Sequence, residues 1–300
     1  MESSSCLSQN IEGIPNIINF SKYSYNAGTQ NRSIVQDNNG FIYFANYEGL
    51  LRFDGTFWKL YPFPNNLIVR SIAVAKDNRI YAAAQNDFGY FSPDKNGTLK
   101  FTSLKNFLSE ADASFDYIGD VVPFGDDIFF RTADKLFQYN HKSVIVYQND
   151  HNWLYLGTHQ HDLIAEDGKN QLLKFTGAEW IPFLKNAATP ENFLITSIIH
   201  FGKDSSLITT RKGKVYILAN DTISDFKFAA NQLSGKLLLC ATTVSEDLIA
   251  IGTDLGGCYF IKKKGQVVQN ISRKDGLQNN TVISVFLDKR KNLWLGLDNG

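Results

Sequence analysis

The sequence predicts an all-β protein, a β-propeller whose blades are four-stranded antiparallel sheets. Three observations predict it. Pairs of short apolar runs recur along the chain, turns rich in Gly and Asn separate them, and aromatic residues reach 13% of the composition, which favours strands. A single four-stranded meander cannot bury both of its faces. Several meanders stacked around an axis can, and that arrangement is a propeller.

The period of the repeat comes from two distant segments that resemble each other. LRFDGTFWKL begins at Leu51 and LKFTGAEWIP begins at Leu173, and each reads as a strand, a glycine turn and an aromatic-led strand. Their separation fits three repeats of roughly 41 residues, which is a typical blade length. Trp58 and Trp180 hold equivalent positions in the two segments, so we expect both to pack between blades, with a role as sugar platforms as the alternative.

Seven copies of the strand–turn–strand pattern can be followed along the chain. They begin at Arg32, Arg70, Tyr117, Trp153, Thr196, Leu237 and Thr281. In the first copy we expect strands over residues 33–36, 41–45, 50–53 and 57–60, joined by tight turns that contain glycine.

These copies predict a propeller over residues 31–300, with six complete blades and a partial seventh over 281–300. Because a half blade leaves an open pairing edge, we expect the natural chain to continue beyond Gly300. Residues 1–30 form an N-terminal segment and a candidate closing strand. The segment Thr102–Ala113 has the apolar spacing of a short helix.

Composition excludes several classes of function. Thirty basic and thirty acidic residues balance, so the chain lacks the basic surface that nucleic-acid binding needs. No apolar stretch is long enough to span a membrane, and the first ten residues lack the apolar core of a leader peptide. Three cysteines, Cys6, Cys240 and Cys258, argue against a disulfide scaffold. A Cys240–Cys258 bridge between neighbouring strands stays open.

The later copies resemble a known repeat. NLWLGLDNG (292–300) and LIAIGTDLGGCYF (248–260) are similar to the two-component regulator propeller repeat, in which a strand and a turn precede L-W-I-G-T-x-x-G-L. The last copy departs from it at Leu297, where Thr is usual. The start of the chain, from Gly13 through the first copy, resembles the beginning of extracytoplasmic sensor regions in Bacteroidetes hybrid two-component regulators and their relatives with a Y-Y-Y domain.

The resemblance implies a periplasmic ligand-sensing region of a membrane-anchored regulator, with the leader peptide, membrane span and signalling domain outside this chain. It further implies a carbohydrate-derived ligand, such as an oligosaccharide, and a homodimer formed through the full-length protein. It implies no enzymatic activity for this region. Two alternatives stay open, a propeller lyase or glycoside hydrolase and a protein-interaction scaffold.

Candidate ligand-binding residues come from propeller geometry. The loops before the innermost strands and those between second and third strands gather on one face, where ligands meet several blades. The candidates are Asn31, Arg32, Tyr47, Glu48, Arg70, Asn86, Asp87, Arg211, Lys212 and Asp254. Arginine suits carboxylate or sulfate groups and tyrosine suits a sugar face. The alternative is that Arg32 and Arg70 only cap the ends of equivalent inner strands.

We predict no catalytic residues, no metal site and no cofactor. G-x-S-x-G, H-E-x-x-H, the P-loop and G-x-G-x-x-G are all missing from the sequence. His151, His159, His161 and Asp162 cluster along the chain and could bind zinc. No cysteine or second carboxylate joins them at metal-like spacing, so we interpret them as loop histidines.

Overall fold

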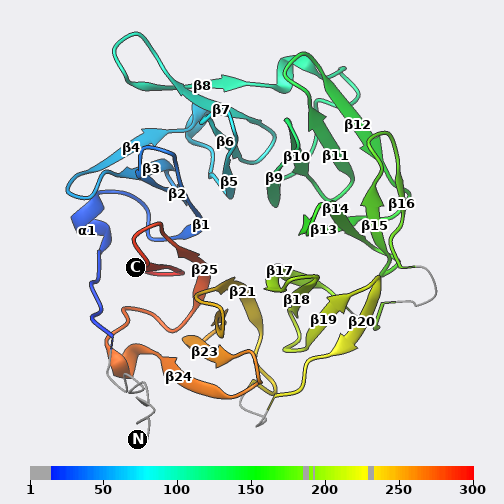
Figure 1. The fold of residues 1–300 in the computed structure, drawn as a ribbon. Helices are drawn as coiled ribbons and strands as arrows, with labels where there is room; N and C mark the ends of the chain where they lie inside the picture. The colour runs from blue at the N-terminus through cyan, green and yellow to red at the C-terminus, as the bar shows by residue number, and fades with distance from the viewer. Residues whose placement is uncertain (1–14, 185–188, 192, 229–232) are drawn as a thin grey trace, which may run out of the picture.

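A computed structural model describes residues 15–184, 189–191, 193–228 and 233–300. In this part of the chain, seven antiparallel sheets surround a common axis, and the first strand of each sheet lies innermost (Figure 1). Six sheets have four strands and the seventh has two. Strand order follows chain order in every sheet, as successive hairpins require. The predicted propeller, with six full blades and a partial seventh, is confirmed.

Blades one to three occupy the first half of the chain. Their strands, from the axis outward, are β1 (Asn31–Gln36), β2 (Ile42–Asn46), β3 (Gly49–Phe53), β4 (Trp58–Pro62); β5 (Ser71–Val74), β6 (Ile80–Ala83), β7 (Phe88–Pro93), β8 (Leu99–Ser103); β9 (Asp120–Phe124), β10 (Asp127–Arg131), β11 (Lys135–Tyr139) and β12 (Val144–Gln148). Each inner strand begins within about three residues of a copy start that the sequence predicts.

Blades four to seven continue the pattern. Their strands are β13 (Trp153–His159), β14 (Asp162–Asp167), β15 (Leu172–Phe175), β16 (Trp180–Pro182); β17 (Ile195–Gly202), β18 (Ser205–Thr210), β19 (Val215–Ala219), β20 (Thr222–Asp225); β21 (Leu238–Thr243), β22 (Leu248–Thr253), β23 (Cys258–Lys262), β24 (Val267–Ile271); β25 (Val282–Leu287) and β26 (Leu293–Leu297). The segments from Leu51 and Leu173 form β3–β4 and β15–β16, three blades apart as predicted.

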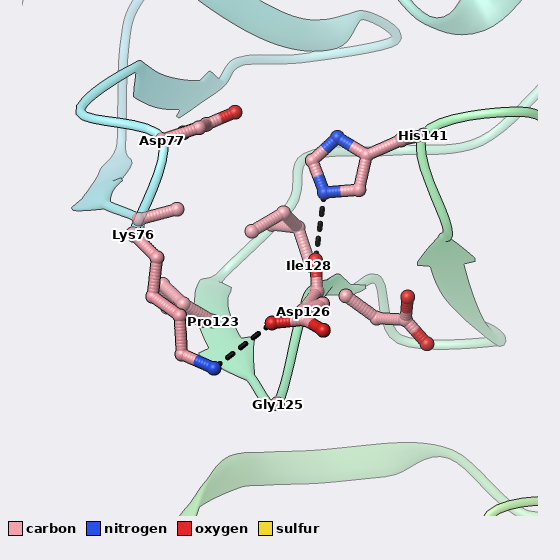
Figure 2. Close-up of a pocket in the computed structure, with 9 residues that line it drawn as sticks. Lys76, Asp77, Pro123, Gly125, Asp126, Ile128 and His141 are labelled. Atoms are coloured by element: carbon pink, nitrogen blue, oxygen red, sulfur yellow. Dashed lines mark hydrogen bonds and ion pairs between the residues drawn. The ribbon is translucent and has the colours of Figure 1, made fainter.

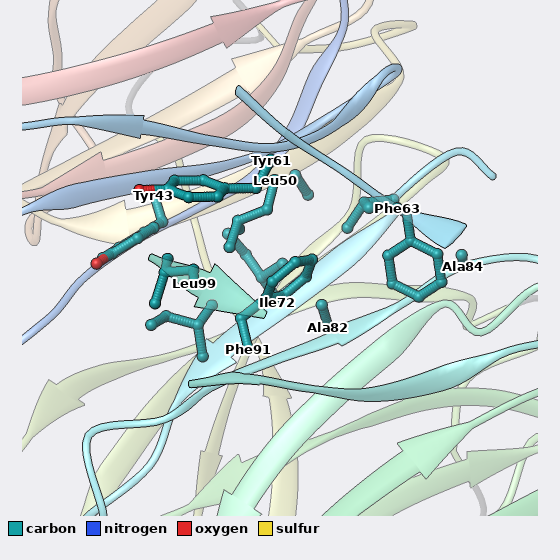
Figure 3. Packing of buried hydrophobic residues seen from close by; sticks show 12 residues of the cluster. Tyr43, Leu50, Tyr61, Phe63, Ile72, Ala82, Ala84, Phe91 and Leu99 are labelled. Carbon is teal, nitrogen blue, oxygen red and sulfur yellow. The ribbon is translucent and has the colours of Figure 1, made fainter. Parts of the chain in front are cut away.

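The hydrophobic core is divided into layers between consecutive blades. Between blades one and two, Tyr43 and Leu50 pack against Ile72, Ala82 and Phe91 (Figure 3). All five side chains are buried. Because each layer is shared by two blades, a blade depends on both of its neighbours for burial.

The two tryptophans confirm the predicted packing between blades. Trp58 stacks on Phe53 with ring centroids 4.4 Å apart and belongs to a cluster that reaches Trp294 of blade seven. Trp180 contacts Phe129 of blade three, 6.4 Å between centroids. Each therefore packs against the preceding blade.

A belt of side chains joins the inner strands around the axis. One residue near the start of each inner strand bonds to the backbone of the next blade. The pairs are Ser33–Ile72, Ser71–Val121, Asp120–Leu156, Tyr155–Ile198, Ser197–Ala241, Cys240–Val282 and Ser284–Asn31. The last pair closes the ring, because the Ser284 hydroxyl donates to the Asn31 carbonyl at 2.7 Å. We call these seven residues the inner belt.

The described part of the N-terminal segment, from residue 15 to α1, lies along the outside of the ring, between β24 and β4 (Figure 1). Within residues 15–30 it contains one helical turn, α1 (Lys22–Tyr25), and no strand. It is held by side chains instead. Phe20 stacks on Trp294 with centroids 6.0 Å apart, and Asn19 Nδ2 donates to the Gly276 carbonyl at 2.8 Å. The candidate closing strand is therefore not formed by residues 15–30. Residues 1–14, which include Cys6 and the region searched for a leader, lie outside the described residues.

The predicted helix over Thr102–Ala113 is wrong. Thr102 and Ser103 complete β8, because they pair with Tyr90 and Gly89 of β7. Only a short 3-10 turn follows, η2 (Lys105–Phe107), since Leu104 is drawn into the core between blades two and three. Two similar turns, η1 (Pro64–Asn66) and η3 (Arg273–Asp275), join other blades.

Cys240 and Cys258 are free thiols. They are not on neighbouring strands, because β22 lies between them and both residues pair with Gly252. The open question of a bridge is thereby answered for these two residues. Burial raises the pKa of both thiols, which keeps them protonated and unreactive.

Candidate functional site

One face of the ring collects the loops that could meet a ligand. In blade one, the start of β1 pairs with the end of β2, and the Tyr47 N–H donates to the Gln30 carbonyl at 3.2 Å. The same bond recurs from Asp254 to Leu237 in blade six and from Asp298 to Thr281 in blade seven. We call this side the loop face and the opposite side the turn face.

Four of the ten predicted ligand-binding residues are used by the scaffold itself. Asn31 is buried and accepts from Asn46 Nδ2 at 2.9 Å. Asn86 and Asp87 hold local backbone and side-chain groups of blade two, including the Ser103 hydroxyl at 2.7 Å from Asp87. Asp254 accepts from the Thr281 hydroxyl at 3.0 Å, which ties blade six to blade seven.

The other predicted residues keep more accessible side chains on the loop face. Tyr47 is 50% exposed, and Glu48, Arg211 and Lys212 are exposed. Arg211 and Lys212 lie in the loop between β18 and β19, strands that Figure 1 shows across the ring from β1. The structure therefore does not bring all ten residues into one site.

Arg32 and Arg70 lie on neighbouring strands, because β1 and β5 are adjacent at the axis and the Ser33 hydroxyl donates to the Ile72 carbonyl at 3.3 Å. Burial and the charge of Arg70 lower the pKa of Arg32, while Asp298 and Tyr117 act in the opposite direction. The Arg70 guanidinium lies over the Tyr117 ring, 4.5 Å from its centroid.

Three neighbours of this pair were not predicted from the sequence. Gln30 accepts from Arg32 Nη2 at 2.9 Å and donates to Asp298 at 2.6 Å. Tyr117, 45% exposed, starts the third copy. The equivalence of copy starts was the available signal, because it places Arg32, Arg70 and Tyr117 on the same face.

A cavity of about 440 Å³ lies on the axis, in the range of small-molecule sites. Six inner strands line it, through Ser33, Ser71, Ile72, Asp120, Val121, Val122, Pro123, Tyr155, Leu156, Gly157, Thr158, Thr196, Ser197, Ile198, Ile199 and Ala241. Ser33 and Ser71 directly follow Arg32 and Arg70. The arginine pair therefore stands at the loop-face end of the strands that form this cavity.

One wall of the axial cavity carries charged groups. Asp120 accepts from Arg131 Nε, in an ion pair at 2.5 Å, and from the Leu156 N–H at 2.9 Å. Arg131 also donates to the Trp153 carbonyl at 3.0 Å. The Tyr155 hydroxyl accepts from the Ile198 N–H at 3.0 Å, and burial raises its pKa. This network positions three neighbouring inner strands.

Behind this wall, Glu166 is completely buried. Its carboxyl group accepts from the N–H groups of Leu194 and Ile195, at 2.8 and 2.7 Å. Burial raises its pKa to about 7, although these two hydrogen bonds act in the opposite direction. Glu166 therefore holds the backbone that leads into β17. Nothing in the sequence pattern distinguished it from an exposed strand residue.

A second cavity of about 200 Å³ lies on the turn face between blades two and three (Figure 2). Lys76 bonds to Asp126 at 2.9 Å, and His141 Nε2 lies 2.7 Å from the Asp126 carbonyl oxygen. Both partners of the ion pair are largely exposed, so it contributes little. The cavity is smaller than typical ligand sites, and we place the candidate site at the axis.

The histidine cluster is not assembled. His151 precedes β13 on the loop face, while His159 and His161 lie at its far end, about 20 Å away along a strand of this length. His159 is buried with Nδ1 2.8 Å from the Ser206 hydroxyl, and burial lowers its pKa. Within the described ranges, no group of three or more His, Cys, Asp and Glu could hold a metal ion.

The last copy shows what the Asp, Asn and Trp residues of the repeat do in the structure. Asp288 accepts from the N–H groups of Arg290 and Asn292 across the β25–β26 turn, and from Trp294 Nε1 at 3.0 Å. Burial acts to raise the pKa of Asp288, but the hydrogen bonds from Trp294 and Asn292 outweigh it and the pKa is lowered. Asp37 forms the same arrangement with Asn39, Phe41 and Tyr43 in blade one.

We expect Asp288→Ala to lower the free energy of unfolding by about 2 kcal/mol, because it removes the buried acceptor of several part-buried N–H donors, Trp294 Nε1 among them. Chemical denaturation followed by tryptophan fluorescence measures this loss. Asp54→Ala is the control, since Asp54 caps a similar but exposed turn. Equal losses for the two variants would contradict the role assigned to Asp288.

These residues lie inside a segment that matches a family model. Residues 276–299 match the model described as two component regulator propeller. Residues 276–299 are therefore similar to the two-component regulator propeller repeat. The match covers β25 and β26, the partial blade. Asp288 and Trp294 stabilise its turn, and Gly296 lies against the Ser284–Asn31 bond that closes the ring. The resemblance noted from the sequence is thereby confirmed for this segment.

Solved structures are similar to the whole ring. The extracellular domain of BT4673 from B. thetaiotaomicron, described as a hybrid two-component system, has a TM-score of 0.71 at 16% identity. The alignment covers 91% of this chain and 38% of that one, so the chain spans well under half of that domain's length. Virginiamycin B lyase from Staphylococcus aureus has a TM-score of 0.70 at 12% identity, covering 90% and 92%.

YCF48 from Cyanidioschyzon merolae is also similar, with a TM-score of 0.66 at 11% identity and coverage of 91% and 94%. At such identities the likeness establishes the propeller fold. No curated protein matches the sequence. In the described part of the chain, no helix has both the length and the apolar character that a membrane span requires.

Proposed function

We propose that the chain is the ligand-sensing propeller of a two-component-type regulator and that it binds a carbohydrate-derived ligand without converting it. The observation that carries this proposal is the repeat match at residues 276–299. The likeness to the extracellular domain of a regulator supports it. On the same ground we propose a periplasmic location, a membrane anchor outside this chain and a homodimer formed through the full-length protein.

We place the ligand on the loop face, with the axial cavity beneath it. The cavity wall carries the hydroxyl groups of Ser33, Ser71 and Thr196. Each already makes a hydrogen bond within the chain and keeps the capacity for a second one, which suits the hydroxyl groups of a sugar. The exposed rings of Tyr47 and Tyr117 suit its apolar faces. A bound ligand would favour one arrangement of the dimer by as much as its affinity differs between the arrangements.

The propeller lyase is the second candidate function. The similarity to virginiamycin B lyase over nearly the full length of both chains favours it, as does the polar wall formed by Asp120, Arg131 and Tyr155. Against it, Asp120 and Arg131 are engaged with each other and with the backbone of blade four. They position strands, and neither is free to take a proton from a substrate.

A thermal-shift screen with neutral, acidic and sulfated oligosaccharides tests the proposal. A ligand that binds only the folded state stabilises it by about 2.7 kcal/mol at a hundredfold excess over Kd, so we expect one glycan class to raise the melting temperature. Recovery of that glycan uncut supports sensing, and its consumption supports the lyase. If no glycan shifts the melting temperature, the sensing proposal fails and the protein-interaction scaffold is favoured.

A further inference from the structure

Two arginines hold equivalent positions at the loop-face end of neighbouring inner strands. Arg32 and Arg70 directly precede Ser33 and Ser71, which line the axial cavity, and the Ser33 hydroxyl donates to the Ile72 carbonyl at 3.3 Å. Burial, and then the positive charge of Arg70, lower the pKa of Arg32, since like charges near each other are mutually destabilising. In the described residues, neither arginine has a carboxylate within ion-pair distance. The pair therefore lacks a direct counter-charge.

The groups around the pair orient it, and the nearest carboxylate, Asp298, acts on Arg32 without forming an ion pair with it. Arg32 donates to the amide oxygen of Gln30 at 2.9 Å, which carries no charge. The nearby Asp298 accepts from Gln30 Nε2 at 2.6 Å, so part of its hydrogen-bonding capacity is already used. The Arg70 guanidinium lies over the Tyr117 ring, 4.5 Å from its centroid, and this cation–π contact favours that position. Both forks are thus held in place.

The position of the pair relates it to the cavity. Ser33 and Ser71, the next residues along β1 and β5, line the axial cavity and belong to the inner belt. A ligand that reaches the cavity from the loop face passes the two arginines. Tyr117, nearly half exposed, offers a ring face beside them.

We propose that Arg32 and Arg70 together bind the oxyanion of an acidic carbohydrate, a carboxylate or a sulfate ester, whose sugar ring lies on Tyr117. This inference rests on the proposed function for the sugar part of the ligand. Guanidinium forks form paired hydrogen bonds with planar and tetrahedral oxyanions. An anion between the two forks would supply the ion pair that neither arginine makes among the described residues, which gives a physical reason for two arginines at neighbouring strand ends.

The test compares the chain with the double variant Arg32→Gln and Arg70→Gln. The probes are a trigalacturonate, a sulfated chondroitin tetrasaccharide and neutral cellotriose, at constant ionic strength, with Kd measured by titration calorimetry. We expect the acidic probes to bind the unaltered chain more tightly than cellotriose. The double variant should weaken that binding by about tenfold or more and leave cellotriose unaffected. Preference between trigalacturonate and the sulfated probe identifies the oxyanion.

A second double variant, Lys203→Gln and Arg290→Gln, is the matched control. It removes the same charge from exposed turns on the turn face, so it reports the effect of net charge alone. Equal Kd values for the acidic probes in both double variants would overturn the anion site. If neutral and acidic probes bind the unaltered chain alike and the arginine variant changes neither, the site is wrong while the proposed function stands.

Inorganic sulfate provides a measurement that does not depend on the sugar. We expect sulfate to raise the melting temperature of the unaltered chain more than that of the arginine variant, against sodium chloride at equal ionic strength. If no oligosaccharide binds but this difference is present, the anion site is supported and the carbohydrate function fails. If sulfate stabilises both proteins equally and no acidic probe binds, the anion site is overturned.

Discussion

Replacing Gly296 with alanine is expected to open the ring between blades seven and one. A Cβ at this position would lie 2.1 Å from the Ser284 hydroxyl and 2.2 Å from the Asn31 carbonyl oxygen. These are the two atoms of the inner-belt bond that closes the ring. Since the Asn31 oxygen belongs to the backbone, it cannot turn aside, and the two blades must separate.

We expect Gly296→Ala to lower the free energy of unfolding by about 3 kcal/mol, at the upper end of overpacking effects. Chemical denaturation followed by tryptophan fluorescence measures the loss, and Trp294 reports directly on blade seven. Gly168→Ala is the control, because its nearest atoms would be 3.3 Å away and its φ lies outside the left-handed region. A loss at Gly296 no larger than at Gly168 would contradict the role of the belt in closure.

The same geometry explains why a glycine pairs with the belt residue in blades six and seven, and why other residues take its place in blades three and four. The residue that pairs with each belt residue faces the backbone of the next blade, as Gly252 faces Val282 and Gly296 faces Asn31. In blades three and four the same position holds Arg131 and Glu166. Charged side chains fit there because their belt partners, Asp120 and Tyr155, reach the next blade through longer side chains.

Much of the fold could be predicted because the signals are local. Turn residues and alternating apolar runs located the inner two strands of every blade, and the match between Leu51 and Leu173 set the period. The short helix was mispredicted because the pairing of Thr102 and Ser103 with β7 and the burial of Leu104 are long-range effects. Helix propensity and the spacing of apolar residues are local signals, so they do not report such long-range effects.

The candidate site could be predicted only in outline. Equivalent copy starts placed Arg32 and Arg70 on one face, and the structure places them on neighbouring strands. Distances across the ring are not encoded in the repeat, so Arg211 could not be assigned to the far side from sequence. The burial of Glu166 could not be predicted either. An acidic residue in an apolar strand is expected to be exposed, and only the structure shows that the N–H groups of Leu194 and Ile195 bind its carboxyl group.

Glu166 makes the stability of the ring depend on pH. Its pKa is about 7 in the folded chain, raised by burial from an ordinary value of 4.5. Between these two pH values the folded state keeps a proton that the unfolded state has lost. The contribution of this proton to stability is therefore complete below pH 4.5 and is lost as pH rises through about 7. The shift corresponds to about 3 kcal/mol.

Glu166→Gln removes this titration, so we expect its free energy of unfolding, relative to that of the unaltered chain, to increase by about 3 kcal/mol between pH 4 and pH 8. Denaturation curves across this range measure it, and taking the difference cancels the titration of all other groups. Glu179→Gln, an exposed glutamate on the same blade, should show no such change. Parallel pH profiles for the unaltered chain and Glu166→Gln would contradict the assignment.

The position of Glu166 connects this titration to the cavity. Its two hydrogen bonds hold Leu194, whose backbone is left-handed with φ of 43°, and Ile195, the first residue of β17. The next residues, Thr196 and Ser197, line the axial cavity. Ser197 also belongs to the inner belt, so the start of β17 is linked to blade six. Because the ionised Glu166 lowers the stability of the folded chain, we expect the Ala241 amide, which donates to Ser197, to exchange its hydrogen faster in the unaltered chain than in Glu166→Gln at pH 8, after correction for intrinsic exchange rates.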